Sequence, residues 1–144
     1  MKGRQVCITG LGAITAAGQG VDALRTMLLT GSTRVRPDPE LGGLPVGRAP
    51  EPLKCKGARR LDRSGALFLA AAKEAWESAG LEAAALDMTR CAVIDGSSLG
   101  VMADLLEAHR DRLHHGDGLP HPSGLVRFMA GAGGAAFAHA YGLQ

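Results

Sequence analysis

Four histidines near the C-terminal part of the sequence could bind a metal ion. Two acidic residues lie close to them in the sequence. The candidate metal ligands are therefore His109, Asp111, His114, His115, Asp117 and His121. Imidazole nitrogens and carboxylate oxygens are common ligands of divalent metals. No two of these histidines are four residues apart, which is the spacing of a compact site on one helix face. A solvated helix end followed by a loop explains them better, because histidine also suits the negative end of a helix. No metal site is therefore expected.

Two glycines, Gly10 and Gly12, follow a β-branched run at Val6–Thr9, as in loops that bind dinucleotide phosphates. That fingerprint needs a third glycine three residues later, where this sequence has Thr15, and a helix that begins at once. The helical pattern here begins only at Val21. The sequence therefore argues against a dinucleotide site and implies no cofactor. We expect these glycines to allow positive φ angles or a close approach of the backbone.

The three cysteines, Cys7, Cys55 and Cys91, are an odd number and show no C-x-x-C spacing. Cys7 and Cys91 lie in strand-like runs, so we expect both to be buried as small apolar residues. This usage favours a reducing, cytoplasmic environment. Ser97 and Ser98 precede a helical pattern and could bind an anion, although capping of the helix is the simpler function.

Basic residues are concentrated between positions 34 and 63. This window holds eight basic and four acidic residues, a balance of +4, so the rest of the chain carries −2 of the net +2. Lys56, Arg59 and Arg60 share one face at the start of a long helical pattern. Such a face is either an ordinary solvated surface or a docking site for an acidic partner. The small net charge gives no indication of nucleic-acid binding.

The hydrophobic periodicity indicates which elements position these residues. It predicts strands at Val6–Thr9, Leu44–Val46 and Cys91–Ile94, and helices at Val21–Leu29, Leu61–Ala79, Val101–Leu113 and within Leu125–Tyr141. This order is typical of a mostly parallel α/β layer. Lys73 and Glu77 are expected to pair on the exposed face of the long helix, which Gly80 should end.

The length of 144 residues suits one domain, and 46% hydrophobic content indicates a folded protein. Gly10 and Gly12 interrupt the first apolar run, which argues against a signal peptide. Residues 128–144 carry no formally charged side chain but are too short and too rich in Gly and Ala to span a membrane. Their small side chains predict that Leu125–Tyr141 needs a partner surface.

Four segments resemble a known family. VCITGLGAIT, RRLDRSGALFLAAAKEAWESAGL, CAVIDGSSLG and the stretch from HPSGLVRF to AYGLQ occur in family order and spacing. They resemble the β-ketoacyl-acyl-carrier-protein synthases, which are condensing enzymes of the thiolase fold. The second segment includes the family's acid at Asp62. Three departures are Ala16 in place of proline, His121-Pro122 in place of Ser-Pro, and the loss of an asparagine around Gly131.

The resemblance implies an α/β, thiolase-like layered fold, of which residues 1–144 form the N-terminal half only. It implies decarboxylative Claisen condensation of acyl thioesters in fatty-acid or polyketide biosynthesis. The family's nucleophilic cysteine, histidines and lysine are expected beyond Gln144, so no catalytic residue is expected in this stretch. Leu99 matches the aliphatic residue that lines the acyl pocket.

The resemblance also implies partners. Lys56, Arg59 and Arg60 match the helix start that docks an acyl carrier protein, and the family pairs as homodimers or as heterodimers with another synthase subunit. The alternative is a non-catalytic subunit that resembles a chain-length factor or binds the carrier protein, and that pairs with a complete synthase. Neither nucleic acid nor a membrane is an expected partner.

Overall fold

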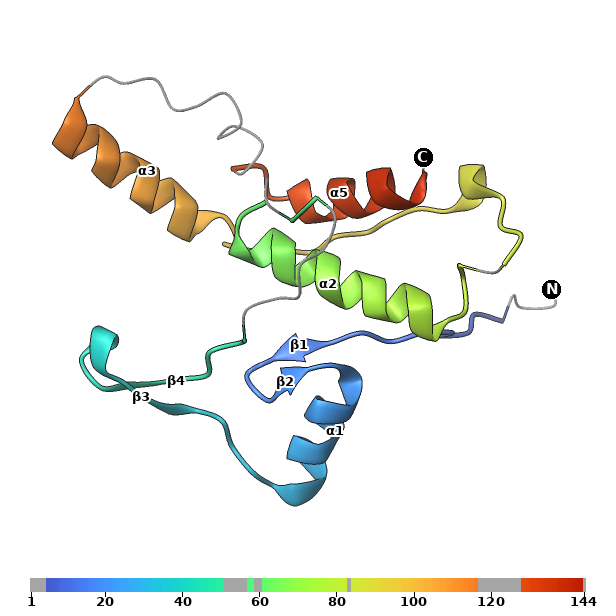
Figure 1. Cartoon of the computed structure of the whole chain (residues 1–144), viewed down its shortest axis with the longest axis horizontal. Helices are drawn as coiled ribbons and strands as arrows, with labels where there is room; N and C mark the ends of the chain where they lie inside the picture. The colour runs from blue at the N-terminus through green and yellow to red at the C-terminus, as the bar shows by residue number, and fades with distance from the viewer. Residues whose placement is uncertain (1–4, 51–56, 59–60, 83, 117–127, 144) are drawn as a thin grey trace. The chain divides into compact units, whose positions relative to one another are not determined.

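The computed structural model describes residues 5–50, 57–58, 61–82, 84–116 and 128–143. These residues form a mixed α/β structure with short antiparallel hairpins and four α-helices (Figure 1). The chain divides into two compact units. The first contains Met1–Glu51 and Ala71–Leu86, and the second contains Pro52–Ala70 and Asp87–Gln144.

The first unit begins with a small ribbon of β1 (Ile14–Thr15) and β2 (Gly18–Gln19), paired antiparallel with Ile14 opposite Gln19. Helix α1 (Val21–Thr30) follows and ends at Gly31, whose φ of 61° is favourable for glycine. A second hairpin pairs β3 (Arg36–Asp38) with β4 (Leu44–Val46) through a 3₁₀ turn at Pro39–Leu41.

In this second hairpin Pro37 lies opposite Pro45. A two-stranded ribbon tolerates this pair because a proline without an N–H group can occupy an edge position. The unit also contains the C-terminal half of helix α2 (Arg63–Ser78), in which Trp76 is buried.

The second unit contains the first half of α2, a 3₁₀ turn at Met88–Arg90, α3 (Met102–His115) and α5 (Ala132–Tyr141). Its buried apolar residues lie before and within α2 and on α5, and they are Leu61, Ala66, Leu69, Ala70, Ala132 and Phe137. Half of this set is alanine, so the core depends on a close approach of the backbones.

The predicted helices are confirmed within two residues at each end. Helices α1, α2 and α3 correspond to the predicted helices at Val21–Leu29, Leu61–Ala79 and Val101–Leu113. Strand β4 corresponds to the predicted strand at Leu44–Val46. Lys73 Nζ lies 3.4 Å from Glu77 Oε1, and Gly80 has a positive φ after the last turn, as predicted. Periodicity locates these elements because each is defined by contacts within its own segment.

Two predicted strands are absent from the part of the chain that the structure describes. Val6–Thr9 and Cys91–Ile94 pair with no strand there, and Val6 and Ile94 are 93% and 94% exposed. The expected burial of Cys7 is also wrong, since it is exposed, while Cys91 is half-buried. A strand exists only when another strand pairs with it, so an apolar β-branched run alone does not produce one.

The described strands are all antiparallel, so the expected parallel layer is not found among these residues. The mixed α/β class itself is confirmed. No helix of the described residues is both long and apolar enough to cross a membrane.

Candidate functional site

The glycine loop lies directly on helix α2. A Cβ atom added at Gly10 would lie 2.1 Å from the carbonyl oxygen of Ala75, and one at Gly12 would lie 1.9 Å from that of Ala71. Neither distance is sterically possible, so only glycine fits at these positions. The expected close approach of the backbone is confirmed, and the surface that the glycines approach is a helix.

Ser78 on α2 forms hydrogen bonds to the same loop. Its hydroxyl oxygen accepts the backbone N–H of Leu11 at 3.1 Å and lies 3.1 Å from the carbonyl oxygen of that residue. The hydroxyl oxygen also lies 3.0 Å from the carbonyl oxygen of Ala75, so one proton serves two acceptors. A single side chain thus satisfies both polar backbone groups of Leu11, much as a neighbouring strand would.

Glu74 holds the far end of the loop. One carboxylate oxygen accepts the N–H of Ala13 at 3.0 Å, and the other accepts the N–H of Val21 at 2.9 Å. Val21 is the first residue of α1, whose N-cap Gly20 has no side chain to offer. Glu74 therefore caps α1 from another helix and places a carboxylate at the positive end of its dipole.

The sequence alone does not reveal Glu74 as a capping residue. Capping is recognised in a sequence by a polar residue immediately before a helix. This carboxylate lies 53 residues from the N–H that it accepts, so no local signal identifies it.

An open depression of about 400 Å³ borders this loop. Its lining residues are Ile8, Thr9, Gly10, Leu11, Val21, Asp22, Glu74 and Ser78. The Glu74 and Ser78 side chains are already bonded to the backbone, and no histidine or cysteine is among these lining residues. The depression thus offers a shaped surface without an activated nucleophile.

In the second unit, Asp62 caps helix α2. It is 3% exposed, and its two carboxylate oxygens accept the N–H groups of Ser64 and Gly65, each at 3.0 Å. These are the second and third residues of the helix, which is the usual geometry of an aspartate N-cap. The acid at the start of this helix therefore fixes where the helix begins.

Helices α2 and α5 approach each other at a pair of glycines. A Cβ atom added at Gly133 would lie 3.0 Å from the Cα atom of Gly65. Beside this contact, Asp95 Oδ2 accepts the N–H of Gly134 at 3.3 Å, in the first turn of α5. Part of the small-residue segment is therefore covered by its own unit, because Ala132, Gly133 and Gly134 are buried.

The turn that carries Leu99 rests on the start of α2. A Cβ atom added at Gly100 would lie 2.4 Å from Ser64 Oγ, and Ser97 Oγ accepts the N–H of Gly100 at 3.3 Å. Ser97 thus closes this turn. The expectation that the serines cap helix α3 is wrong, since its N-cap is Val101 and no side chain bonds there. Leu99 is 66% exposed at the outside of the turn, and its predicted place in an acyl pocket stays a prediction.

The predicted docking residues Lys56, Arg59 and Arg60 lie outside the described residues, so their role also stays a prediction. His109 and His114 are exposed on α3, whereas Asp117 and His121 lie outside the described residues. Within the described ranges, no three residues of the types His, Cys, Asp and Glu lie close enough to hold a metal ion.

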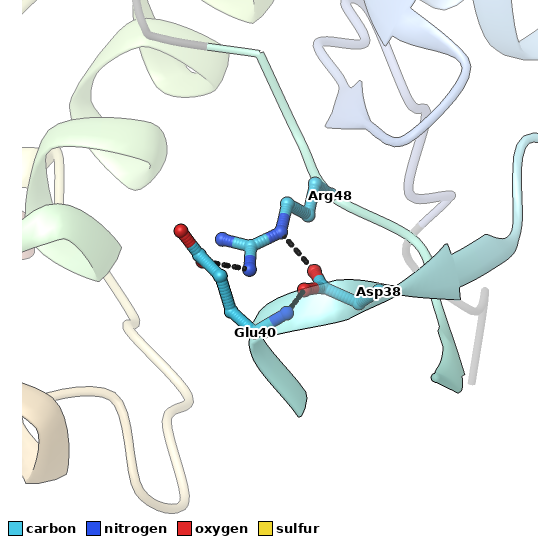
Figure 2. A network of polar contacts seen from close by, with 3 residues as sticks. All are labelled: Asp38, Glu40 and Arg48. Atoms are coloured by element: carbon cyan, nitrogen blue, oxygen red, sulfur yellow. Dashed lines mark hydrogen bonds and ion pairs between the residues drawn. The ribbon is translucent and has the colours of Figure 1, made fainter. Parts of the chain in front are cut away.

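A charged cluster joins the two ends of the second hairpin (Figure 2). Asp38 is 6% exposed and accepts hydrogen bonds from Arg48 Nε and from the N–H of Glu40 at 2.9 Å. The Arg48 guanidinium also lies 2.7 Å from Glu40 Oε2. The hydrogen bond from Arg48 is the main cause that holds the pKa of Asp38 below its ordinary value of 3.8.

Known proteins share sequence similarity with this chain. The sequence model described as "Beta-ketoacyl synthase, N-terminal domain" matches residues 51–144. The chain is also 31% identical over 112 residues to the 3-oxoacyl-[acyl-carrier-protein] synthase 2 of Coxiella burnetii (strain RSA 493 / Nine Mile phase I). That alignment covers 71% of this chain and 27% of the relative, so the chain spans about a quarter of the relative's length. The chain belongs to the β-ketoacyl synthase family.

Proposed function

We propose that this chain forms the N-terminal part of a β-ketoacyl-acyl-carrier-protein synthase in fatty-acid or polyketide biosynthesis. The observation that carries this proposal is the family match over residues 51–144, which includes α2, the Leu99 turn, α3 and α5. The complete protein would catalyse the decarboxylative Claisen condensation of acyl thioesters.

The condensation needs a nucleophile and hydrogen-bond donors at the reacting atoms. A cysteine thiolate attacks an acyl thioester, and the carrier thiol leaves. Decarboxylation of the second thioester then releases CO₂ and leaves a carbanion, which attacks the acyl-enzyme and frees the cysteine. Hydrogen-bond donors must stabilise the charge that develops on the thioester oxygen. We assign none of these roles to residues 1–144.

We assign supporting roles to this chain instead. Leu99 would line the acyl pocket. Its side chain is exposed on a turn that the Ser97–Gly100 hydrogen bond closes, which supports contact with an alkyl chain. Lys56, Arg59 and Arg60 would dock an acidic acyl carrier protein in the cytoplasm, and a second synthase subunit would complete the assembly.

The thiolase-like layered fold is part of the same proposal. It is supported by the two apolar runs Val6–Thr9 and Cys91–Ile94, which have strand-like sequences but expose the side chains of Val6, Ile8 and Ile94. Burying such β-branched side chains in a sheet would stabilise the layered fold. Strands supplied by the remainder of a complete synthase would cover them.

A second candidate is a non-catalytic subunit that resembles a chain-length factor. The departures from the family pattern at Ala16, His121 and Gly131 favour it. The codons that follow Gln144 in the gene discriminate between the two candidates. A Thr-Ala-Cys sequence at the nucleophile position supports the condensing enzyme, whereas a folded synthase half without that cysteine supports the second candidate.

A chimera tests the proposed function directly. Residues 1–144 replace the matching segment of the Coxiella burnetii synthase, and condensation of an acyl-carrier thioester with a malonyl-carrier thioester is followed by radiolabelled product. The parent synthase and a chimera with its nucleophilic cysteine changed to alanine are the controls. We expect product above the alanine control. A folded, dimeric chimera that becomes acylated but forms no product contradicts the proposal.

A further inference from the structure

The turn that carries Leu99 is held at both of its ends. At one end, Asp95 Oδ2 accepts the N–H of Gly134 at 3.3 Å, in the first turn of α5. At the other end, Gly100 lies so close to α2 that a Cβ atom added to it would be 2.4 Å from Ser64 Oγ. All of these residues belong to the second unit. The turn is therefore anchored to two helices, and Leu99 lies directly beside the anchor on α2.

The backbone of Leu99 is also fixed. Its carbonyl oxygen accepts the N–H of Met102, the first residue of α3, at 3.0 Å. The N–H of the next residue, Gly100, donates to Ser97 Oγ at 3.3 Å. The side chain of Leu99 is nevertheless 66% exposed. A leucine with a fixed backbone and an open side chain offers a precisely placed apolar surface.

Two hydroxyl oxygens face Gly100, and a buried carboxylate holds one of them in place. Ser64 Oγ donates to Asp62 Oδ2 at 2.5 Å, and Asp62 is 3% exposed. The same carboxylate oxygen accepts the backbone N–H of Ser64 at 3.0 Å. The other hydroxyl belongs to Ser97, which is exposed and can change its rotamer. Ser64 is therefore the fixed surface against which Gly100 packs.

This contact explains why position 100 is a glycine. The φ angle of Gly100 does not lie in the left-handed region that favours glycine, so its backbone conformation would accept alanine. The nearest obstacle is Ser64, whose Oγ and Cβ atoms would lie 2.4 Å and 3.0 Å from the added Cβ. Gly96, at the start of the same turn, has no atom within 4 Å of its added Cβ. The turn is thus crowded at the glycine that follows Leu99.

We propose that Ser64 is a positioning residue for acyl-chain length, because it holds Gly100 and thereby Leu99 in a fixed place. Asp62 orients the Ser64 hydroxyl, and Leu99 contacts the end of the alkyl chain of the acyl thioester. The inference rests on the proposed function for its ligand, whereas the contact between Ser64 and Gly100 does not. A fixed leucine sets a sharp upper limit to the length of the alkyl chain, and a loosened one admits longer chains.

Amide hydrogen exchange in the 144-residue chain tests whether Ser64 holds the turn. Ser64→Ala removes the hydroxyl but keeps the two backbone N–H groups that Asp62 accepts, so the cap of α2 stays in place. We expect the amides of Gly100 and Met102 to exchange about tenfold faster in Ser64→Ala, because their hydrogen bonds depend on the position of the turn. The amide of Val21, which is bonded in the first unit, should keep its rate. Unchanged rates at Gly100 and Met102 would overturn the inference.

A double-mutant cycle tests the contact itself. We expect Gly100→Ala to lower the melting temperature of the chain, whereas Gly96→Ala should not lower it because its added Cβ meets no atom. In a chain that also carries Ser64→Ala, the loss caused by Gly100→Ala should fall by about half, since the nearest Ser64 atom is then 3.0 Å away. Losses that simply add would show that positions 64 and 100 do not touch, and the inference would fail.

The chimeric synthase tests the effect on specificity. The measured quantity is the ratio of kcat/KM for an acyl chain just longer than the native limit to kcat/KM for a two-carbon acyl group. We expect Ser64→Ala to raise this ratio about tenfold, because a loosened Leu99 no longer excludes the longer chain. Ser78→Ala is the matched control, since it removes a hydroxyl from the same helix that bonds to Leu11 in the first unit. It should lower stability and leave the ratio unchanged.

The outcomes separate this inference from the proposed function. A native chimera that forms no product with any acyl chain contradicts the proposed function, and the exchange rates of Gly100 and Met102 still decide whether Ser64 holds the turn. In an active chimera, faster exchange with an unchanged length ratio would overturn the assignment of Ser64 to chain length. Equal changes of the ratio in Ser64→Ala and Ser78→Ala would attribute the effect to lost stability and would also overturn it.

Discussion

The carboxylate of Glu74 accepts the backbone N–H of Val21 at 2.9 Å, across 53 residues of sequence. Its other oxygen accepts the N–H of Ala13, so one side chain on α2 fixes both sides of the β1–β2 ribbon. The position of α1 thus depends on a residue that belongs to another helix.

Substitution of Glu74 should show this dependence. Hydrogen bonds to a charged group contribute about 1.5–3 kcal/mol, so we expect Glu74→Ala to lower the free energy of unfolding by about 2 kcal/mol. Glu74→Gln keeps one acceptor oxygen and should cost about half as much. The control Glu77→Ala removes only the exposed pair with Lys73 and should change stability by less than about 0.5 kcal/mol. Urea unfolding measures all three, and equal effects of Glu74→Ala and Glu77→Ala would contradict the capping role.

Gly12 should tolerate no side chain. Its added Cβ would lie 1.9 Å from the carbonyl oxygen of Ala71, so Gly12→Ala must push the loop away from α2. We expect a loss of roughly 3 kcal/mol or more in unfolding free energy, as in overpacked cores. Gly96→Ala is the matched control, because no atom lies within 4 Å of its added Cβ. A Gly12→Ala chain that melts at the native temperature would show that the loop does not rest on the helix.

Acid should weaken the second hairpin through Asp38. Its pKa in the folded chain lies below the ordinary value of 3.8, chiefly because of the hydrogen bond from Arg48. A lowered pKa means that the folded state favours the ionised form. The contribution is therefore complete above about pH 4 and is lost as the pH falls through the folded pKa. NMR titration of the Asp38 carboxyl carbon measures this directly, and Arg48→Gln should return the midpoint toward 3.8. A midpoint that is the same in both chains would exclude Arg48 as the cause.

The sequence predicts α1, α2 and α3 because the apolar periodicity and the helix-ending residues lie within each helix's own segment. The Lys73–Glu77 pair and the end of α2 before Gly80 are examples. It also predicts that Gly10 and Gly12 serve a close approach. It does not reveal Glu74 or the contact of Gly65 with Gly133, since these depend on which segments meet in space. The exposed Val6–Thr9 run is predicted as a strand for the same reason. Its β-propensity is a property of the run alone, whereas a strand also needs a second strand that pairs with it.

Leu99 should limit the length of the acyl chain if it lines the acyl pocket. In the chimeric synthase, Leu99→Phe adds volume to the pocket wall, while Leu99→Ala removes it. One methylene in an apolar pocket is worth about 1–3 kcal/mol, so we expect at least a tenfold loss with long acyl chains for Leu99→Phe. Activity with a two-carbon acyl group should be kept. Parallel losses with short and long acyl chains would place Leu99 outside the pocket.

The docking prediction concerns the three basic residues that precede α2 in the sequence. An acidic carrier protein that meets Lys56, Arg59 and Arg60 gains chiefly in encounter rate and orientation, because exposed ion pairs contribute about 0.2–1 kcal/mol each. Reversal of two charges by Arg59→Glu and Arg60→Glu in the chimera should therefore weaken carrier binding by roughly 1–2 kcal/mol, or about five- to thirty-fold. The loss should shrink as salt rises, since salt screens exposed charges.

Two controls separate docking from general damage. Turnover of a small acyl thioester without a carrier should hardly change in the double variant, because that substrate does not contact the basic face. Reversal of Arg25 and Arg34 by Arg25→Glu and Arg34→Glu changes the net charge equally at exposed positions of the first unit and should weaken carrier binding much less. Normal carrier binding by the Arg59→Glu, Arg60→Glu variant at low salt would show that these residues form only a solvated surface. Equal weakening by both double variants would indicate an effect of net charge, without a specific docking role for Arg59 and Arg60.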